Sequence, residues 1–119
     1  MCKDFIDLKD VLERVQDDWE LLLELLEIFQ EDYQDKRNQL TQVISAGDFE
    51  QIRNIAHSLK GAAGNISATE FHNGFFEMEQ AATDEEMERI QQVMARLDGQ
   101  FPELKKCIAK IKDDYQKSH

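Results

Sequence analysis

The chain has 119 residues, including one proline, five glycines and 33% charged residues, and its net charge is −11. This acidic balance argues against nucleic acid and anionic membrane surfaces as partners, because both are themselves polyanions, and no apolar stretch is long enough for insertion into a membrane. A chain of this length can bury a core of its own, so we expect residues 1–119 to form a single all-α domain.

The first half of the chain predicts helices separated by short breaks. Asp7 can cap a short helix that runs to about Val15. A long leucine-rich helix follows from about Trp19 to Ser45, and Gly47 is a natural stop. The apolar residues of both segments recur at helical spacing, which predicts one buried face on each helix.

The next helices each begin at a capping residue. Asp48 offers a cap for a helix that ends near Asn65. The serine and glutamate of the segment Ser67-Ala-Thr-Glu70 match the capping-box pattern, which predicts a helix that begins there and ends near Ala82.

The last helix is predicted from a second capping box, Thr83–Glu86, to about Tyr115. Pro102 removes a backbone donor, so we expect a kink or break near Asp98–Phe101. Short connections between amphipathic helices imply antiparallel packing. The predicted fold is an antiparallel four-helix bundle with a short accessory N-terminal helix.

Residues 56–67 place a histidine on the outer face of the third helix. On a helical wheel His57 lies almost opposite the apolar residues of its own helix. Within about 60° of the histidine fall several polar or small residues, among them Arg53, Lys60, Gly61 and Gly64. We therefore expect both the imidazole of His57 and the ammonium of Lys60 to face solvent.

The two glycines beside His57 predict a partner protein. A glycine inside a helix costs about 1 kcal/mol relative to alanine. No internal neighbour is expected to need close packing at Gly61 or Gly64. Because Gly64 is near the helix end, the free-energy cost of a glycine there is weaker evidence for a partner. We interpret the missing side chains as clearance for the backbone of another protein near His57.

An exposed histidine beside a lysine suits phosphoryl chemistry. A neutral imidazole nitrogen can act as a nucleophile and carry a covalent group, and Lys60 can place a positive charge near an anionic group on His57. The chain has no P-loop, no Gly-rich nucleotide loop and no kinase motif set. The phosphoryl donor and acceptor are therefore expected to be other proteins.

The run His-Ser-Leu-Lys-Gly-Ala-Ala-Gly-Asn-Ile resembles the signature of histidine-containing phosphotransfer (HPt) domains, and the similarity covers roughly residues 5–115. The resemblance implies that His57 is phosphorylated on Nε2 by a receiver-domain aspartyl phosphate and passes the group to another receiver. It implies that Lys60 stabilises the phosphoryl group and that Gly61 leaves room for docking. Many family members carry glycine where this chain has Ser67, which we interpret as a helix cap.

Partners follow from the same resemblance. Receiver domains of response regulators are the expected partners, and a hybrid histidine kinase is a further candidate. No cofactor is expected in this chain, and Mg²⁺ is expected only in the partner receiver domain. We expect the protein to be a monomer.

Two residues of the fourth helix are candidates for the site. Related domains of chemotaxis histidine kinases place a glutamate at the position that matches Glu79, where it accepts a hydrogen bond from the histidine Nδ1. In this chain that contact would fix the tautomer of His57 and leave Nε2 as the nucleophile. An exposed glutamate without this role is the alternative. Phe76 is a candidate docking anchor, or else it covers a neighbouring helix.

The remaining histidines and cysteines predict no further chemistry. His72 and His119 have no expected partners, and the histidines lack metal-ligand spacing, so we predict no metal site. Cys2 and Cys107 form no CxxC pair, and the N-terminal residues have no signal-peptide core. We therefore expect reduced thiols and a cytoplasmic protein.

Other functions stay open at this point. An autophosphorylating kinase fragment usually has a glutamate directly after the histidine, where this chain has Ser58. A phospho-acceptor domain of the chemotaxis-kinase type has a motif close to this one. A non-catalytic helical adaptor would use the bundle surface for binding, and His57 would then be incidental.

Overall fold

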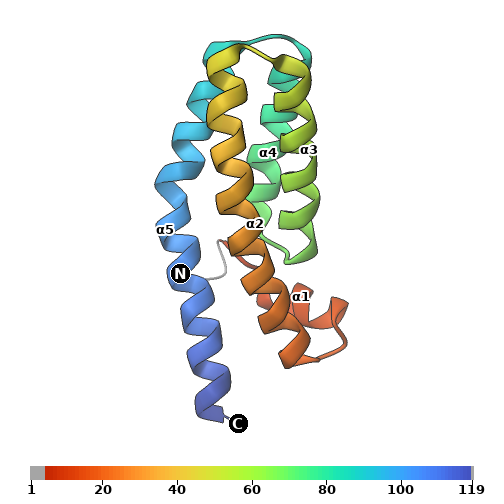
Figure 1. The fold of residues 1–119 in the computed structure, drawn as a ribbon. Helices are drawn as coiled ribbons and strands as arrows, with labels where there is room; N and C mark the ends of the chain where they lie inside the picture. The colour runs from red at the N-terminus through yellow and green to blue at the C-terminus, as the bar shows by residue number, and fades with distance from the viewer. Residues whose placement is uncertain (1–4, 119) are drawn as a thin grey trace.

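The computed structural model describes residues 5–118, which form helices and no strand (Figure 1). The helices in chain order are α1 (Leu8–Arg14), α2 (Trp19–Ala46), α3 (Phe49–Asn65), α4 (Thr69–Thr83) and α5 (Met87–Ser118). The predicted all-α class is confirmed.

Aspartates cap the N-termini of the first three helices. The side chains of Asp7, Asp18 and Asp48 accept hydrogen bonds from the backbone N–H three residues later, at 3.1, 3.0 and 3.2 Å. Gly47 ends α2 in the left-handed conformation, with φ of 67°, which glycine adopts without steric cost. The caps predicted at Asp7 and Asp48 and the stop at Gly47 are confirmed.

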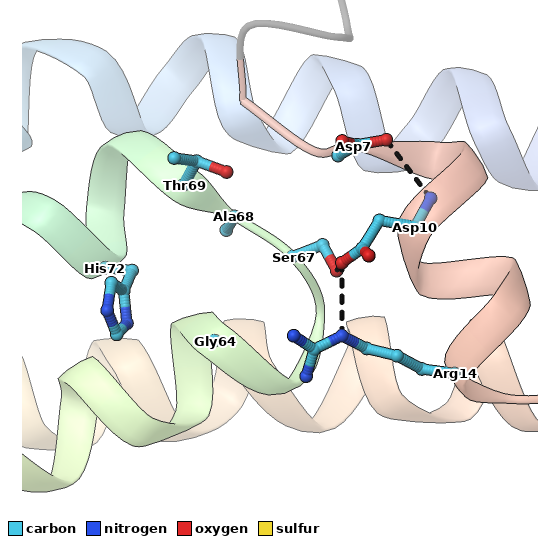
Figure 2. A pocket seen from close by; sticks show the side chains of 8 residues that line it. All are labelled: Asp7, Asp10, Arg14, Gly64, Ser67, Ala68, Thr69 and His72. Carbon is cyan, nitrogen blue, oxygen red and sulfur yellow. Dashed lines mark hydrogen bonds and ion pairs between the residues drawn. The ribbon is translucent and has the colours of Figure 1, made fainter.

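The capping box predicted at Ser67 is wrong. Helix α4 has Ala68 as its N-cap, with no side-chain hydrogen bond to the helix. Ser67 has a φ of 55°, and its hydroxyl donates instead to Oδ2 of Asp10 at 2.6 Å (Figure 2). Its carbonyl accepts from the N–H of Asp7 at 2.9 Å. The left-handed backbone at Ser67 thus directs its side chain to α1, and the residue joins α1 to the α3–α4 connection.

The second predicted capping box, at Thr83–Glu86, is also wrong. Thr83 is the last residue of α4, and its hydroxyl donates to the carbonyl of Glu79 at 3.0 Å. The turn to α5 is made by Glu85, which has a φ of 55°. Because the threonine hydroxyl is satisfied within its own helix, it does not cap the next one.

Helix α5 continues through Gly99 and Pro102, so of the kink or break predicted near Asp98–Phe101 the break does not occur. Pro102 is exposed, and its ring needs no space in the core. The buried residues Leu97 and Leu104 on either side hold the helix against the rest of the protein. Figure 1 shows α5 changing direction along its length while remaining one helix.

The core lies between the four longer helices. Helix α3 packs against α4, α4 against α5, and α2 against both α3 and α5 (Figure 1). Aromatic side chains fill the centre: Tyr33 of α2 and Phe71 and Phe75 of α4 are at most 2% exposed. This packing holds α3 and α4 side by side, which brings residues far apart in the sequence to one surface.

Cys107 lies buried on α5 and is disulfide-bonded. The expectation of a reduced thiol is therefore wrong for this residue. Cys2 and His119 lie outside the described residues. Within residues 5–118, no helix combines the length and apolar character needed to cross a membrane.

Candidate functional site

The imidazole of His57 stands on the outer face of α3. The buried side of this helix is made of Ile52, Ala56, Leu59 and Ala63. The His57 side chain is 67% exposed, although α3 packs against both α2 and α4. The ring is therefore accessible to another protein.

Glu79 of α4 contacts His57 and Lys60 at once. Nδ1 of His57 lies 2.8 Å from Oε2 of Glu79, and Nζ of Lys60 donates to Oε1 at 2.7 Å. Burial alone would raise the pKa of the Glu79 carboxyl, but the hydrogen bonds from Lys60 and His57 outweigh it and hold that pKa below its ordinary value. Because an ionised carboxylate only accepts, Nδ1 carries the proton in this contact.

Lys60 is less exposed than expected. Its side chain is 20% exposed, and Nζ lies 5.3 Å from the centre of the Phe76 ring. The expectation that the ammonium faces solvent is wrong, because Glu79 and Phe76 of the neighbouring helix both contact it. Phe76 itself is 45% exposed, so its ring both packs on Lys60 and remains available at the surface.

The two glycines of α3 differ in their surroundings. A Cβ atom at Gly61 would meet no atom within 4 Å, whereas one at Gly64 would lie 3.4 Å from Nδ1 of His72. The expectation of no internal neighbour is therefore wrong for Gly64, because the His72 ring packs over it. At Gly61 the surface beside the histidine is open.

His72 is linked to the site, although no partner was expected for it. Its Nδ1 donates to the backbone carbonyl of Lys60 at 3.1 Å. The bond joins the first turns of α4 to the residue whose ammonium contacts Glu79. No sequence pattern signals such a bond, because a backbone carbonyl is present at every position.

Lys36 of α2 approaches the site from the other side of α3. Its Nζ donates to Oγ of Ser58 at 2.7 Å and to Oδ2 of Asp32 at 3.1 Å. Ser58 directly follows His57 in the chain, so α2 contributes an ammonium that contacts the residue next to the histidine. Sequence reasoning missed Lys36, because the contact spans two helices.

A shallow depression lies between α3 and α4 next to His57. Its lining includes Arg53, Lys60, Phe76 and Glu79. The structure thus brings four of the predicted site residues together around one hollow. Within residues 5–118, no group of three or more His, Cys, Asp or Glu side chains is arranged to hold a metal ion.

The arrangement supplies a nucleophile and a nearby cation. With Nδ1 bonded to Glu79, the lone pair of a neutral imidazole resides on Nε2, at the other edge of an exposed ring. Such a nitrogen can attack an electrophile carried by another molecule. Lys60 provides a positive charge one helical turn away.

The chain matches a protein-family model. The family model described as Hpt domain matches residues 24–114 of the chain. Comparisons with curated proteins and with solved structures returned no match. The matched span contains α3 and α4 whole, and therefore the site described above.

Proposed function

The chain belongs to the Hpt domain family, whose members act in histidine phosphotransfer and interact with response-regulator receiver domains, and from this premise we propose that His57 is the residue that carries the phosphoryl group. One observation supports this assignment above the others. The His57 ring is 67% exposed while its Nδ1 contacts Glu79, so Nε2 faces the surroundings as the free nitrogen.

The proposed reaction takes place in two displacements. Nε2 of His57 attacks the phosphorus of a receiver aspartyl phosphate, a P–N bond forms, and the bond from phosphorus to the aspartate oxygen breaks, which releases the carboxylate. A carboxylate of a second receiver then attacks the same phosphorus and the P–N bond breaks. Positioning and charge stabilisation carry most of such phosphoryl transfers.

Glu79 and Lys60 would support both displacements. Glu79 orients the imidazole through Nδ1, and its negative charge offsets the positive charge that the ring gains when Nε2 is phosphorylated. The Lys60 ammonium shares this carboxylate, and it lies close enough to contribute positive charge to the transferring phosphoryl group.

The surface around His57 suits the docking of a receiver domain. At Gly61 the helix surface is open, so a partner backbone can approach the imidazole. The exposed ring of Phe76 would be an apolar anchor, and Arg53 lines the hollow beside it. Gly64 belongs to the same proposed docking surface, with the His72 ring against it.

Further parts of the proposal concern the whole protein. We take α2 to α5 as the antiparallel four-helix core of one domain, with α1 as the accessory helix. The protein is proposed to act as a cytoplasmic monomer, with receivers or a hybrid histidine kinase as partners. It requires no cofactor of its own, and Mg²⁺ is bound by the receiver.

The test is a transfer reaction with a phosphorylated receiver domain. The wild-type chain should become labelled with phosphate that is labile in acid and stable in base, and the variant His57→Gln should not. The variant His119→Gln removes a histidine that has no part in the proposed site, so it is the matched control and should still accept the label. Equal labelling of wild type and His57→Gln would contradict the assignment.

A phospho-acceptor domain of the chemotaxis-kinase type is the second candidate. The contact between His57 and Glu79 favours it, because related domains of those kinases use a glutamate at this position. This function requires a kinase core that binds ATP. Labelling by such a core with ATP, in the absence of any receiver, would favour this candidate over the relay.

A further inference from the structure

The centre of the α2–α5 contact contains a buried hydroxyl without a partner. Tyr33 is 2% exposed, and its Oη has no hydrogen-bond partner among the described residues. The Tyr33 ring stacks on Phe101, with ring centroids 4.1 Å apart and planes at 10°. Buried polar groups are nearly always hydrogen-bonded, so this hydroxyl requires an explanation.

A second polar group at the same place lacks its usual partner. Pro102 lies inside α5 and has no N–H, so the carbonyl of Asp98 does not receive the bond that a helix normally supplies from four residues later. The side chain of Asp98 is engaged with Arg37 of α2, where Nε of Arg37 donates to Oδ1 at 2.9 Å. One short segment of the interface therefore combines an unpaired donor and a carbonyl without its helical donor.

An open hollow is lined by the residues that carry these groups. Tyr33, Arg37, Asp98, Phe101 and Pro102 all line it. Burial, and after it the negative charge of Asp98, raise the pKa of the Tyr33 hydroxyl against the opposing effect of Arg37. The hydroxyl is therefore protonated at neutral pH and acts as a donor. A water molecule needs between two and four polar partners to be held in such a place.

We propose that this hollow holds an ordered water molecule that accepts a hydrogen bond from the Tyr33 hydroxyl and donates one to the backbone carbonyl of Asp98. The water thereby bridges α2 and α5 at the proline. The water takes the place of the N–H that Pro102 lacks. This site accounts for two observations together: the buried hydroxyl without a partner among the described residues, and the continuation of α5 through a proline.

The sign of one stability change tests the proposal. If water satisfies the hydroxyl, Tyr33→Phe removes a hydrogen bond, and the folding equilibrium constant should fall about fivefold. If the hydroxyl is buried without any partner, the same substitution removes a desolvation cost, and the constant should rise. Urea denaturation of the full chain measures the change, and a rise would overturn the proposal.

A second variant tests the bridge to α5. Pro102→Ala supplies an N–H to the Asp98 carbonyl, so the water loses an acceptor. Tyr33→Phe should then lower the folding equilibrium constant by a smaller factor in this background than in the wild type. An equal fall in the two backgrounds would overturn the proposed water bridge. A crystal structure at a resolution that shows ordered waters should reveal a density peak within hydrogen-bonding distance of Tyr33 Oη in the wild type and none in Tyr33→Phe. An empty hollow in the wild type would also overturn it.

Discussion

The carboxylate of Glu79 joins the two residues of α3 that the chemistry needs. It contacts Nδ1 of His57 through one oxygen and Nζ of Lys60 through the other. Because a single group contacts both, the orientation of the imidazole and the position of the ammonium both depend on Glu79. A substitution at Glu79 should therefore change both, whereas a substitution at Lys60 leaves the imidazole contact in place.

The ionisation of Glu79 should be visible in the pH dependence of stability. The pKa of Glu79 is held below its ordinary value of 4.5 by Lys60 and His57, against the effect of burial. A lowered pKa in the folded state means that the stabilisation is fully present above pH 4.5 and is lost as the pH falls through the lower, folded-state value. We predict that the wild type is more stable than Glu79→Gln at pH 6 and that the difference disappears in acid.

Urea denaturation at a series of pH values measures this difference. Glu77→Gln is a matched control, because Glu77 lies on the same helix and pairs with Arg89 and Arg96, away from the site. A stability difference for Glu79→Gln that persists unchanged at low pH would contradict the prediction.

The sequence allowed the direction of His57 to be predicted but not the environment of Lys60. A helical wheel uses only the residues of one helix, and it is sufficient to separate the buried face of α3 from the face that carries His57. The contacts of Lys60 with Glu79 and Phe76 depend on how closely α4 approaches α3. That distance depends on tertiary packing, which the wheel does not contain.

Helix boundaries show the same division between local and tertiary causes. The caps at Asp7 and Asp48 could be predicted because the capping bond lies within one turn. Ser67 fits a capping pattern equally well, yet its hydroxyl bonds to Asp10, 57 residues away in the chain. Its φ of 55° also explains why glycine suits this position in the family, because glycine adopts that conformation without strain.

Two glycines on exposed helix surfaces allow a test of the proposal that Gly61 leaves space for a partner protein near His57. Neither Gly61 of α3 nor Gly99 of α5 would bring a Cβ within 4 Å of another atom. Replacing either by glutamine should stabilise the protein by about 0.5–1 kcal/mol, because glutamine favours helix more than glycine does. Only Gly61→Gln should slow phosphoryl transfer, because its glutamine side chain occupies the surface beside His57.

Thermal unfolding and the rate of transfer from a phosphorylated receiver measure the two effects separately. Gly99→Gln is the matched control, with a similar gain in stability and an unchanged rate. If Gly61→Gln transfers as fast as the wild type, the glycine does not serve to admit a partner. A loss of stability in Gly61→Gln would instead show that the helix surface there is not open.

At the scale of the whole molecule, net charge acts against the compact fold. The chain carries 25 acidic and 14 basic residues, and the folded protein measures 48 × 23 × 21 Å. Electrostatic interactions reach about 30 Å at 0.01 M salt but only about 8 Å at 0.15 M. At low salt the acidic residues therefore repel one another across the full width of the protein.

We predict that raising the salt concentration from about 0.01 to about 0.15 M at pH 7 stabilises the fold. Screening removes the long-range repulsion, while close ion pairs such as Arg37–Asp98 are screened less because their charges are in contact. The expected gain is about 1 kcal/mol, which for a domain of this size raises the midpoint of thermal unfolding by about 4 °C. Near the isoelectric point of about 4.6 the net repulsion vanishes, so the gain should vanish there too. A midpoint that falls with salt at pH 7 would show that ion pairs outweigh the net charge.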